Sequence, residues 1–315
     1  MRYDFAPLEG LTDSIYRRLH HKYFSGVDRY FTPFFSPTVH RALTPREARE
    51  LPPADSLDFT AVPQLLTKVP EDFLWMAGVC RDRGYKEVNL NIGCPSGTVT
   101  AKGKGSGMLR DLDALDCFLD TIFADSPLPI SIKTRIGFES AEEFTNILKI
   151  YNRYPLKELI IHPRVRKDFY NGPVDMDGFR YTLEESKAPV CYNGSLRTKH
   201  EILDFCEAFP SVDSIMLGRG LIADPGLLSP GGTTADKLEG FHEELLEEYT
   251  REFGSTRNAM FRLKENWRHW LCKFDGSEKL GKRLCKATDV NEYKAVTQEI
   301  FHNLPMRDAI IPDWD

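Results

Sequence analysis

The sequence of 315 residues contains no apolar run near the roughly 20 residues of a membrane-spanning helix, so we expect no membrane partner. Cysteine is sparse: seven residues are scattered along the chain without a C-x-x-C pair, which argues against a disulfide framework and a zinc site. H-E-x-x-H and similar motifs are missing, so we predict no catalytic metal. No G-x-G-x-x-G fingerprint follows the first strand-like segment, so a Rossmann-type dinucleotide site is not indicated.

The N-terminal segment Met1–Phe5 runs straight into a strand pattern and does not resemble a signal peptide, which with reduced thiols predicts a cytoplasmic protein. The net charge of −6 argues against a protein that is basic throughout. One segment differs, because Arg251–Lys286 holds ten Lys and Arg against four acidic residues. This asymmetry predicts an anionic partner for the C-terminal region, although a solvated helix surface would have the same composition.

Eight short strand-like segments recur along the chain, several of them near-continuous apolar runs typical of parallel strands buried on both faces. Helical periodicity fills the intervals, as in Leu115–Phe123 and Phe144–Tyr151. Repeated strand–helix alternation predicts an α/β fold, a (β/α)8 TIM barrel. The eight segments are Tyr3–Pro7, Tyr30–Phe34, Thr60–Leu66, Glu87–Gly93, Ile130–Ile136, Glu158–Pro163, Pro189–Asn193 and Ser214–Gly218.

The pattern changes beyond the eighth segment. A stretch rich in Pro, Gly, Ser and Thr predicts a linker over residues 229–235, after a barrel domain over residues 1–228. Residues 236–315 carry helical stripes and no strand signal, which predicts a small all-helical C-terminal domain.

Cys94 is the most informative single residue. It follows a buried strand pattern in a Gly93-Cys94-Pro95 turn, and the glycine-rich run Gly97–Gly107 comes next, with Lys102 and Lys104 inside it. A thiol beside a cationic loop suits acid or nucleophile chemistry, although a buried structural cysteine would also fit the pattern.

Polar side chains recur at the carboxyl ends of the predicted strands, where barrels of this type build their active sites. Polar groups inside apolar strands cost free energy unless they are paired, so we expect a polar ligand across the barrel mouth. Glycine turns after strands seven and eight, with an arginine, suggest a phosphate site. A lysine in strand five would meet negative charge on a ring, and flavin mononucleotide has both features. The strand-end residues include Glu9, Gln64, Asn89, Asn91, Cys94, Lys133, Arg135, His162, Arg164, Asn193 and Arg219.

Over nearly its whole length the chain resembles the flavin-dependent tRNA-dihydrouridine synthases. The six segments that carry the resemblance are Ala6–Asp13, Asn89–Pro95, Ser131–Gly137, Ile161–Arg164 with Tyr170–Gly172 after it, Asn193–Ser195 and Gly218–Gly220. The resemblance implies an FMN-binding barrel, a helical domain that binds folded tRNA, and reduction of the uracil 5,6 double bond with NADPH as the reductant.

The resemblance also implies a role for each matched residue. Flavin would deliver hydride to carbon 6 of the base, and Cys94 would give a proton to carbon 5. Expected flavin ligands are Pro7, Leu8, Glu9, Gln64, Lys133, His162, Asn193, Gly194, Ser195, Gly218 and Arg219. Expected substrate contacts are Asn91, Arg135, Arg164, Lys102 and Lys104.

Alternative functions remain open from the sequence alone. The same flavin chemistry could act on ribosomal RNA or on a free pyrimidine, although the basic C-terminal segment argues against a small molecule. A non-catalytic RNA-binding homologue is a further alternative, which the presence of Cys94 and Lys133 disfavours. We expect a monomer.

Overall fold

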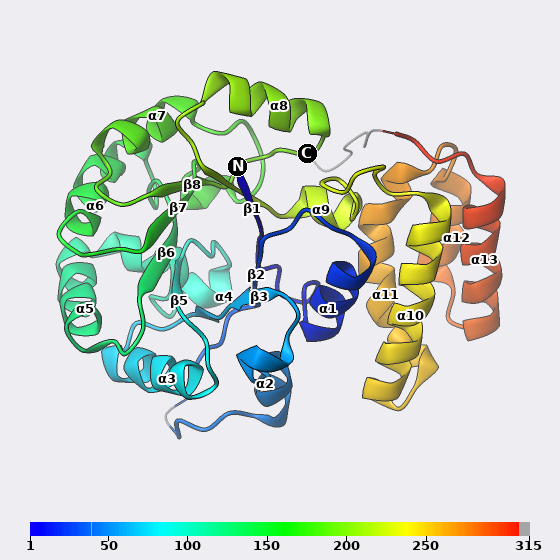
Figure 1. Ribbon diagram of the computed structural model, residues 1–315, viewed down its shortest axis with the longest axis horizontal. Coiled ribbons are helices and arrows are strands. Elements are labelled where there is room, and N and C mark those ends of the chain that lie inside the picture. The colour runs from blue at the N-terminus through cyan, green and yellow to red at the C-terminus, as the bar shows by residue number, and fades with distance from the viewer. Residues whose placement is uncertain (39, 309–315) are drawn as a thin grey trace. The chain divides into compact units, whose positions relative to one another are not determined.

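The computed structural model describes residues 1–38 and 40–308 of the chain. Nine parallel strands form one sheet in the order β3-β2-β1-β9-β8-β7-β6-β5-β4. The two ends of that order, β3 (Thr60–Val62) and β4 (Gln64–Leu65), are separated only by Pro63, so the sheet curls into a nearly closed barrel (Figure 1). Pro63 interrupts the strand because proline has no N–H to donate. The other strands are β1 (Arg2–Phe5), β2 (Arg29–Phe31), β5 (Val88–Ile92), β6 (Ile130–Arg135), β7 (Glu158–His162), β8 (Val190–Tyr192) and β9 (Ser214–Leu217).

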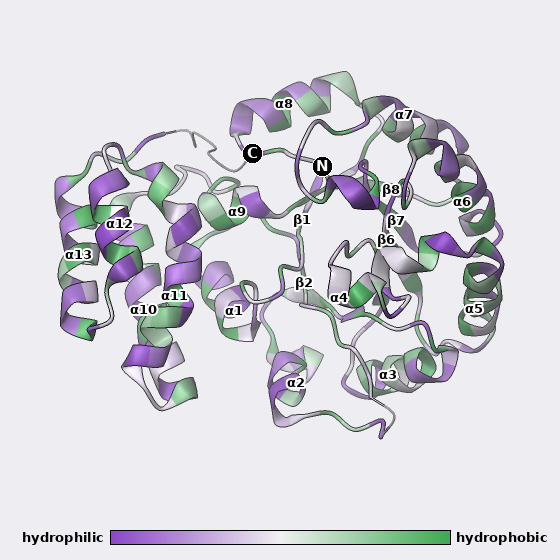
Figure 2. Ribbon diagram, turned by 180° about the vertical axis from the view of Figure 1, so that it is seen from behind, coloured by the Kyte–Doolittle hydropathy of each residue, from purple (hydrophilic) through white to green (hydrophobic). Residues whose placement is uncertain are grey.

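At least one helix follows each strand position, which confirms the predicted fold class, and each of the eight predicted segments overlaps a strand. Helices α3 (Pro70–Asp82), α5 (Leu112–Asp125), α6 (Phe144–Tyr151) and α7 (Met176–Glu185) lie outside the strands β5 to β8 in Figure 1, and Figure 2 shows both hydrophobic and hydrophilic residues along them. In α5, Asp111 caps the first turn by accepting from the Ala114 N–H, and the buried stripe consists of Leu115, Phe118, Leu119 and Ile122.

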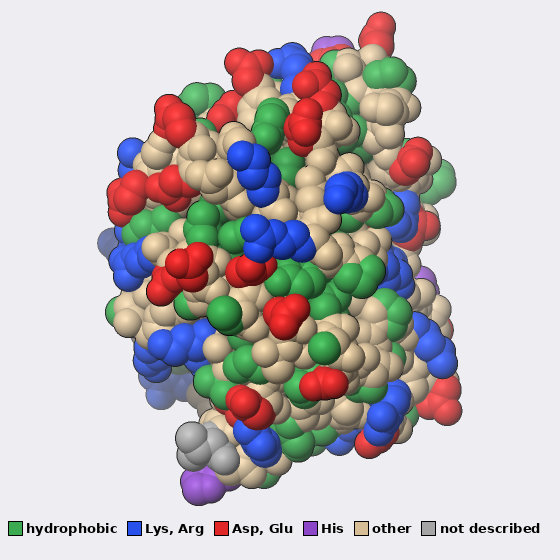
Figure 3. Space-filling model, turned by 90° about the vertical axis from the view of Figure 1, so that its left-hand side faces the viewer, with side chains coloured by type: hydrophobic (Ala, Val, Ile, Leu, Met, Phe, Trp, Pro, Cys, Tyr) green, Lys and Arg blue, Asp and Glu red, His purple; other side chains and the backbone are tan. Residues whose placement is uncertain are grey.

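Acidic and basic side chains are interspersed on the face of the molecule shown in Figure 3. Among the described residues, no helix is both long and apolar enough to cross a membrane. The remaining short elements described in this part of the chain are α2 (Pro45–Glu50), α4 (Gly97–Thr100) and four 3-10 turns, of which Gly105–Arg110 is the longest.

The chain divides into two compact units. The first comprises Met1–Glu9, Asp28–Ser195 and Phe209–Met216, and the second comprises Gly10–Val27, Leu196–Ala208 and the chain from Leu217 onward. The predicted boundary between residues 228 and 236 stays a prediction, and residues 309–315 of the predicted helical domain lie outside the described residues. The helices of the second unit are α1 (Ser14–Tyr23), α8 (Lys199–Ala208), α9 (Arg219–Ala223), α10 (Ala235–Phe253), α11 (Thr256–Trp270), α12 (Glu278–Lys286) and α13 (Val290–Asn303).

Aromatic side chains form the core of the C-terminal helices. Trp267 and Trp270 of α11 are fully buried, and their rings lie 5.5 Å apart. The hydroxyl of Tyr293 accepts from Trp267 Nε1 over 3.1 Å and is hydrogen-bonded to His242 Nε2 over 2.7 Å. Burial lowers the pKa of His242 to about 3, so this histidine is a neutral core residue.

The basic segment of the sequence is partly neutralised by its surroundings. Five of its ten cations pair with carboxylates; Arg262 pairs with Asp13, for example, and buried Lys273 with Asp224 at 2.9 Å. All five are Arg251, Arg262, Arg268, Lys273 and Arg283. Lys264 donates to backbone carbonyls. The exposed remainder, without a carboxylate partner among the described residues, consists of Arg257, Lys279, Lys282 and Lys286.

The interior of the barrel changes from apolar to charged toward the amino ends of the strands. An apolar layer, on which Leu8 also packs, consists of Ala6, Phe31, Val62, Ile160, Cys191 and Met216. At the amino ends, Arg29 lies between Asp4 (2.6 Å), Glu158 (2.5 Å) and Glu87 (3.0 Å). Burial opposes the charged guanidinium, but hydrogen bonding to Asp4 and the two nearest carboxylates raise the pKa of Arg29 overall.

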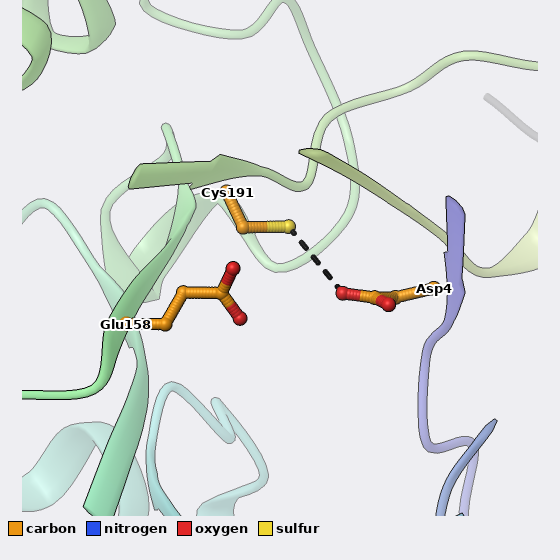
Figure 4. Close-up of side chains that lie close together, drawn as sticks. All are labelled: Asp4, Glu158 and Cys191. Carbon is orange, nitrogen blue, oxygen red and sulfur yellow. Dashed lines mark hydrogen bonds between the residues drawn. The ribbon is translucent and has the colours of Figure 1, made fainter. Parts of the chain in front are cut away.

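Three side chains at this end have atoms that bind metals in other proteins. Potential ligand atoms of Asp4, Glu158 and Cys191 lie within 4.8 Å of one another, and the Cys191 thiol is 3.9 Å from Asp4 (Figure 4). Both carboxylates are already ion-paired with Arg29 and Arg2, and burial followed by the charges of Asp4 and Glu158 raises the pKa of Cys191. Because the thiol is protonated and both carboxylates are ion-paired, these three side chains stabilise the amino end of the barrel and do not form a metal centre.

Candidate active site at the barrel mouth

Amide side chains from neighbouring strands form a hydrogen-bonded layer inside the barrel. Asn89 and Asn91 point to the same side of β5 because strand side chains alternate. Gln64 donates from Nε2 to Asn89 Oδ1 over 2.8 Å and accepts at Oε1 from Asn91 Nδ2 over 2.7 Å. Asn89 donates in turn to Ser131 Oγ over 2.9 Å. The layer fixes the direction of every amide edge, which suits the recognition of a polar planar ligand.

The turn that carries Cys94 is held from both sides. Asn91 Oδ1 accepts from the backbone N–H groups of Gly93 (3.0 Å) and Cys94 (2.9 Å), while Ser106 donates its N–H and hydroxyl to the Cys94 carbonyl. Gly105 has φ +57°, and a Cβ added there would lie 2.9 Å from the Cys94 carbonyl oxygen. Only glycine fits this close approach, which explains part of the glycine-rich run after the turn.

The thiol of Cys94 is protonated near neutral pH. Burial raises its pKa, and a hydrogen bond from the Ser96 backbone with the charges of Arg135 and Lys133 opposes only part of that rise. The side chain is nevertheless partly exposed. A protonated, accessible thiol can donate a proton to a ligand at the mouth.

Lys133 lies beside Asn91 in the register of β5 and β6. Among residues 1–38 and 40–308, its ammonium has no hydrogen-bond or ion-pair partner. Burial, followed by repulsion from Arg135, lowers the pKa of Lys133 to about 8. A half-buried lysine without a counter-charge is costly by itself, so an anionic group of a ligand is its natural partner.

His162 is a neutral hydrogen-bond relay. Its Nε2 faces Arg164 Nη1 at 3.2 Å, and because arginine only donates, Nε2 must accept and Nδ1 must carry the proton. Nδ1 then donates to the Asn193 carbonyl over 2.6 Å. Burial and the charges of Arg135, Lys133 and Arg164 lower the pKa of His162 well below its usual range. Arg164 also donates to Ser195 Oγ over 3.0 Å, so the relay connects the ends of β7 and β8.

Arg135 is fully buried and donates to three backbone carbonyls. Nε reaches Gly93 over 2.9 Å, Nη1 reaches Val165 over 2.9 Å, and Nη2 reaches Phe169. Its guanidinium therefore ties the Cys94 turn to the loop after β7. Direct contact of Arg135 with substrate stays a prediction, since this arrangement assigns it a positioning role.

The other predicted residues of the first unit lie in the segments that follow the carboxyl ends of β1 and β5. Pro7 and Leu8 are half-buried, whereas exposed Glu9 forms an ion pair with Arg46 at 3.1 Å. Lys102 is exposed. Lys104 donates to Ser36 Oγ over 2.8 Å, and burial, with repulsion from Lys102 and Lys68, lowers the pKa of Lys104 despite the nearby Asp72.

The predicted phosphate residues fall into both units. Asn193, Gly194 and Ser195 end β8 in the first unit, and a Cβ at Gly194 would overlap the Tyr192 hydroxyl at 1.9 Å. Gly218 and Arg219 begin α9 in the second unit. The shared phosphate site of these five residues stays a prediction.

Neither Ser131 nor Arg197 was predicted from the sequence as a site residue, and Asn89, one of the strand-end residues, was given no specific role. Ser131 joins Asn89 in the amide layer, and strict alternation along the fifth strand segment could have placed Ser131 inside the barrel. Arg197 has a buried Nε with no hydrogen-bond partner among the described residues, and it lies near Gly220, whose added Cβ would lie 2.7 Å from the Leu196 carbonyl. Its place in the turn after the seventh strand segment was the available signal.

The mouth thus combines a protonated thiol, an unpaired lysine and a fixed layer of amides. These groups fit a planar ligand that has hydrogen-bonding edges and one anionic edge, with a second reactant placed against Cys94.

Three comparisons relate this arrangement to known proteins. The family model described as dihydrouridine synthase matches residues 4–301. A curated relative, the "Probable tRNA-dihydrouridine synthase 1" of Synechocystis sp., is 26% identical over 92% of this chain and 83% of its own length. A "Probable tRNA-dihydrouridine synthase" of Staphylococcus epidermidis is 26% identical over 78% of each chain. A solved structure of a mutant morphinone reductase in complex with tetrahydroNAD aligns with a TM-score of 0.50 over 72% of this chain and 85% of its own, at 11% identity, which supports the barrel fold.

Proposed function

The chain belongs to the dihydrouridine synthase family, and from that premise we propose that it reduces the uracil 5,6 double bond of uridines in tRNA, using FMN and NADPH. The names of the two relatives, both tRNA-dihydrouridine synthases, support tRNA as the substrate. The observation that carries the proposal is the protonated Cys94 thiol beside unpartnered Lys133, each close enough to affect the pKa of the other.

Some residues of the mouth act on the flavin ring and others on the uracil base. When bound, FMN would supply hydride for carbon 6 of the uracil, after reduction by NADPH. Cys94 gives its proton to carbon 5, so one hydride and one proton are added across the double bond. The thiolate that remains faces Arg135 and Lys133, whose positive charges stabilise it until it is protonated again.

Binding is assigned to the groups around them. Lys133 would meet the anionic edge of the ring, and Gln64 with Pro7, Leu8 and Glu9 would hold the ring. The phosphate end would be bound by the residues predicted for it, which are His162, Asn193, Gly194, Ser195, Gly218 and Arg219. Asn91, Arg164, Lys102 and Lys104 contact the RNA, whose uridine must leave its stack to reach Cys94. We further propose that the protein is a cytoplasmic monomer.

The test is anaerobic reduction and reoxidation of the purified protein. We expect flavin absorption that bleaches with NADPH and returns when an unmodified tRNA transcript is added. Faster return with a ribosomal RNA fragment or a free pyrimidine would overturn the substrate. A colourless protein that cannot be reconstituted with FMN would overturn the flavin chemistry.

A further inference from the structure

Four side chains from three successive loops form an alternating stack at the rim of the mouth. Arg110 ends the 3-10 turn that follows β5, and its guanidinium carbon lies 4.1 Å from the centroid of the Phe138 ring, in the loop after β6. On the same ring lies Arg166, from the loop after β7, at 5.2 Å. Arg166 also lies 5.3 Å from the Phe169 ring. We call Arg110, Phe138, Arg166 and Phe169 the rim stack.

The loops that carry the rim stack are joined by backbone hydrogen bonds. The Arg166 N–H donates to the Gly137 carbonyl over 2.9 Å, and the Ile136 N–H donates to the Arg164 carbonyl over 3.3 Å. Gly137 cannot be replaced without movement, because a Cβ there would lie 2.1 Å from the Ser140 carbonyl oxygen. The stack is therefore a built arrangement rather than a chance approach of flexible arginines.

The positive charge of the rim stack is unbalanced. Neither Arg110 nor Arg166 has a carboxylate partner among the described residues, and Arg166 Nε is buried without any hydrogen-bond acceptor there. The nearby acids are used elsewhere: Glu143 accepts from the backbone of Phe138 and its two successors, and Asp168 accepts from the Val165 N–H. Two guanidiniums on one ring repel each other unless an anion joins them.

The outer member of the stack is held in an unfavourable and exposed position. Phe169 has φ +51°, a conformation that is rare for a bulky residue, and 42% of it is exposed. Its carbonyl is held by Arg135, the same guanidinium that contacts Gly93 in the Cys94 turn. Tyr170 beside it is 49% exposed. The protein thus maintains an apolar ring in solvent, in a loop tied to the reactive thiol.

We propose that the rim stack binds the unpaired nucleotides that flank the reactive uridine, with a base on Phe169 and phosphates on Arg110 and Arg166. This inference rests on the proposed function. An exposed aromatic ring accepts the face of any base, and a planar guanidinium matches a phosphate in two parallel hydrogen bonds. Both arginines lie on segments linked to the Cys94 turn. Gly105, which packs on Cys94, opens the 3-10 turn that Arg110 ends, and Arg135 joins Gly93 to Val165, the residue before Arg166.

The test compares the Arg110→Ala/Arg166→Ala double variant with wild type as FMN-loaded proteins. We expect normal bleaching by NADPH, a Kd for a tRNA transcript that is weaker by roughly 10- to 100-fold, and a salt dependence reduced by about two phosphate contacts. The KM for tRNA should rise more than kcat falls. The matched control is Arg180→Ala, because Arg180 also lies over a ring, Phe209, at 5.5 Å but is paired with Asp177 at 2.7 Å. This control should bind RNA as wild type does.

Two further variants separate stacking from charge. Arg110→Lys/Arg166→Lys should keep the salt dependence but lose part of the affinity, and Phe169→Leu should lose affinity without changing the salt dependence. If wild type turns over tRNA and the double alanine variant binds tRNA as tightly as wild type, the role of the rim stack is wrong but the proposed function stands. Wild type that binds no RNA would overturn both this inference and the proposed function. If polyglutamate displaces tRNA from wild type as well as oligouridylate does, the rim stack binds an acidic protein instead of RNA.

Discussion

The two ends of the barrel use the same charged residue types in opposite ways. At the amino ends of the strands, Arg29 is surrounded by Asp4, Glu87 and Glu158, and every charge has a counter-charge. At the carboxyl ends, Lys133 and the rim stack carry positive charge that no carboxylate of the described residues neutralises. The paired charges stabilise the amino end of the barrel, whereas the unpaired cations are available to an anionic ligand. Charge pairing therefore separates structural from functional residues in this barrel better than burial does.

Removing the thiol tests the functional end most directly. Cys94→Ala should retain flavin and its reduction by NADPH but lose about 10²- to 10⁴-fold in uridine turnover, because a general acid at carbon 5 is missing. Single-turnover reoxidation by tRNA measures the loss. Cys80→Ala is the control, since Cys80 is a fully buried core thiol whose pKa burial raises to about 12. Normal turnover by Cys94→Ala would contradict the proton-donor assignment.

Removing Arg29 tests the structural end. Arg29→Met leaves Asp4 and Glu158 buried with fewer counter-charges, so it should lower the free energy of unfolding by about 3–5 kcal/mol. Urea titration of the apoprotein, followed by circular dichroism, measures the difference.

The same substitution at the mouth should behave in the opposite way. Lys133→Met removes a cation without a partner, so stability should change by less than about 1 kcal/mol or improve, while FMN affinity falls. Equal destabilisation by the two variants would abolish the contrast between the two ends.

Much of the barrel could be predicted from sequence because the strands are buried on both faces. Segments such as Leu159–Ile161 and Ile215–Leu217 are continuous apolar runs, and their order with helices between them leaves few folds. Pro63 lies inside one predicted strand segment, Thr60–Leu66. In the structure it divides this segment into β3 and β4, and the sequence does not show that the two halves pair with different neighbouring strands.

The site was predictable where one strand end supplies a group, as with Cys94 and Lys133. Groups that depend on distant partners were not: Arg110, Phe138 and Arg166 come from separate loops, and nothing in their local sequence indicates that they stack. The basic segment shows the converse limit. Its ten cations predict a surface that binds an anionic partner. Acidic residues from elsewhere in the chain, including Asp13 and Asp224, form ion pairs with several of these cations.

A pH series gives the most specific test of the contrast. Lys133 has a pKa of about 8 in the folded protein and about 10.4 in the unfolded chain. Between these values the unfolded chain holds the proton and the folded protein has released it, so the free energy of unfolding must rise with pH. We expect the apoprotein to gain on the order of 1–2 kcal/mol relative to Lys133→Met as pH rises above 8, since partial exposure reduces the effect.

Flavin binding should depend on pH in the opposite direction. An anionic ligand prefers the protonated lysine, so FMN affinity of wild type should fall above pH 8 while that of Lys133→Met stays flat. Arg29 keeps its charge throughout this range, so no such dependence arises at the other end of the barrel. Fluorescence titration with FMN from pH 7 to about 9.5 measures the affinity, and urea titration in the same buffers measures the stability. If stability rises with pH while FMN affinity falls, Lys133 both destabilises the apoprotein and binds the ligand. If stability and affinity change with pH in the same direction, Lys133 has another partner.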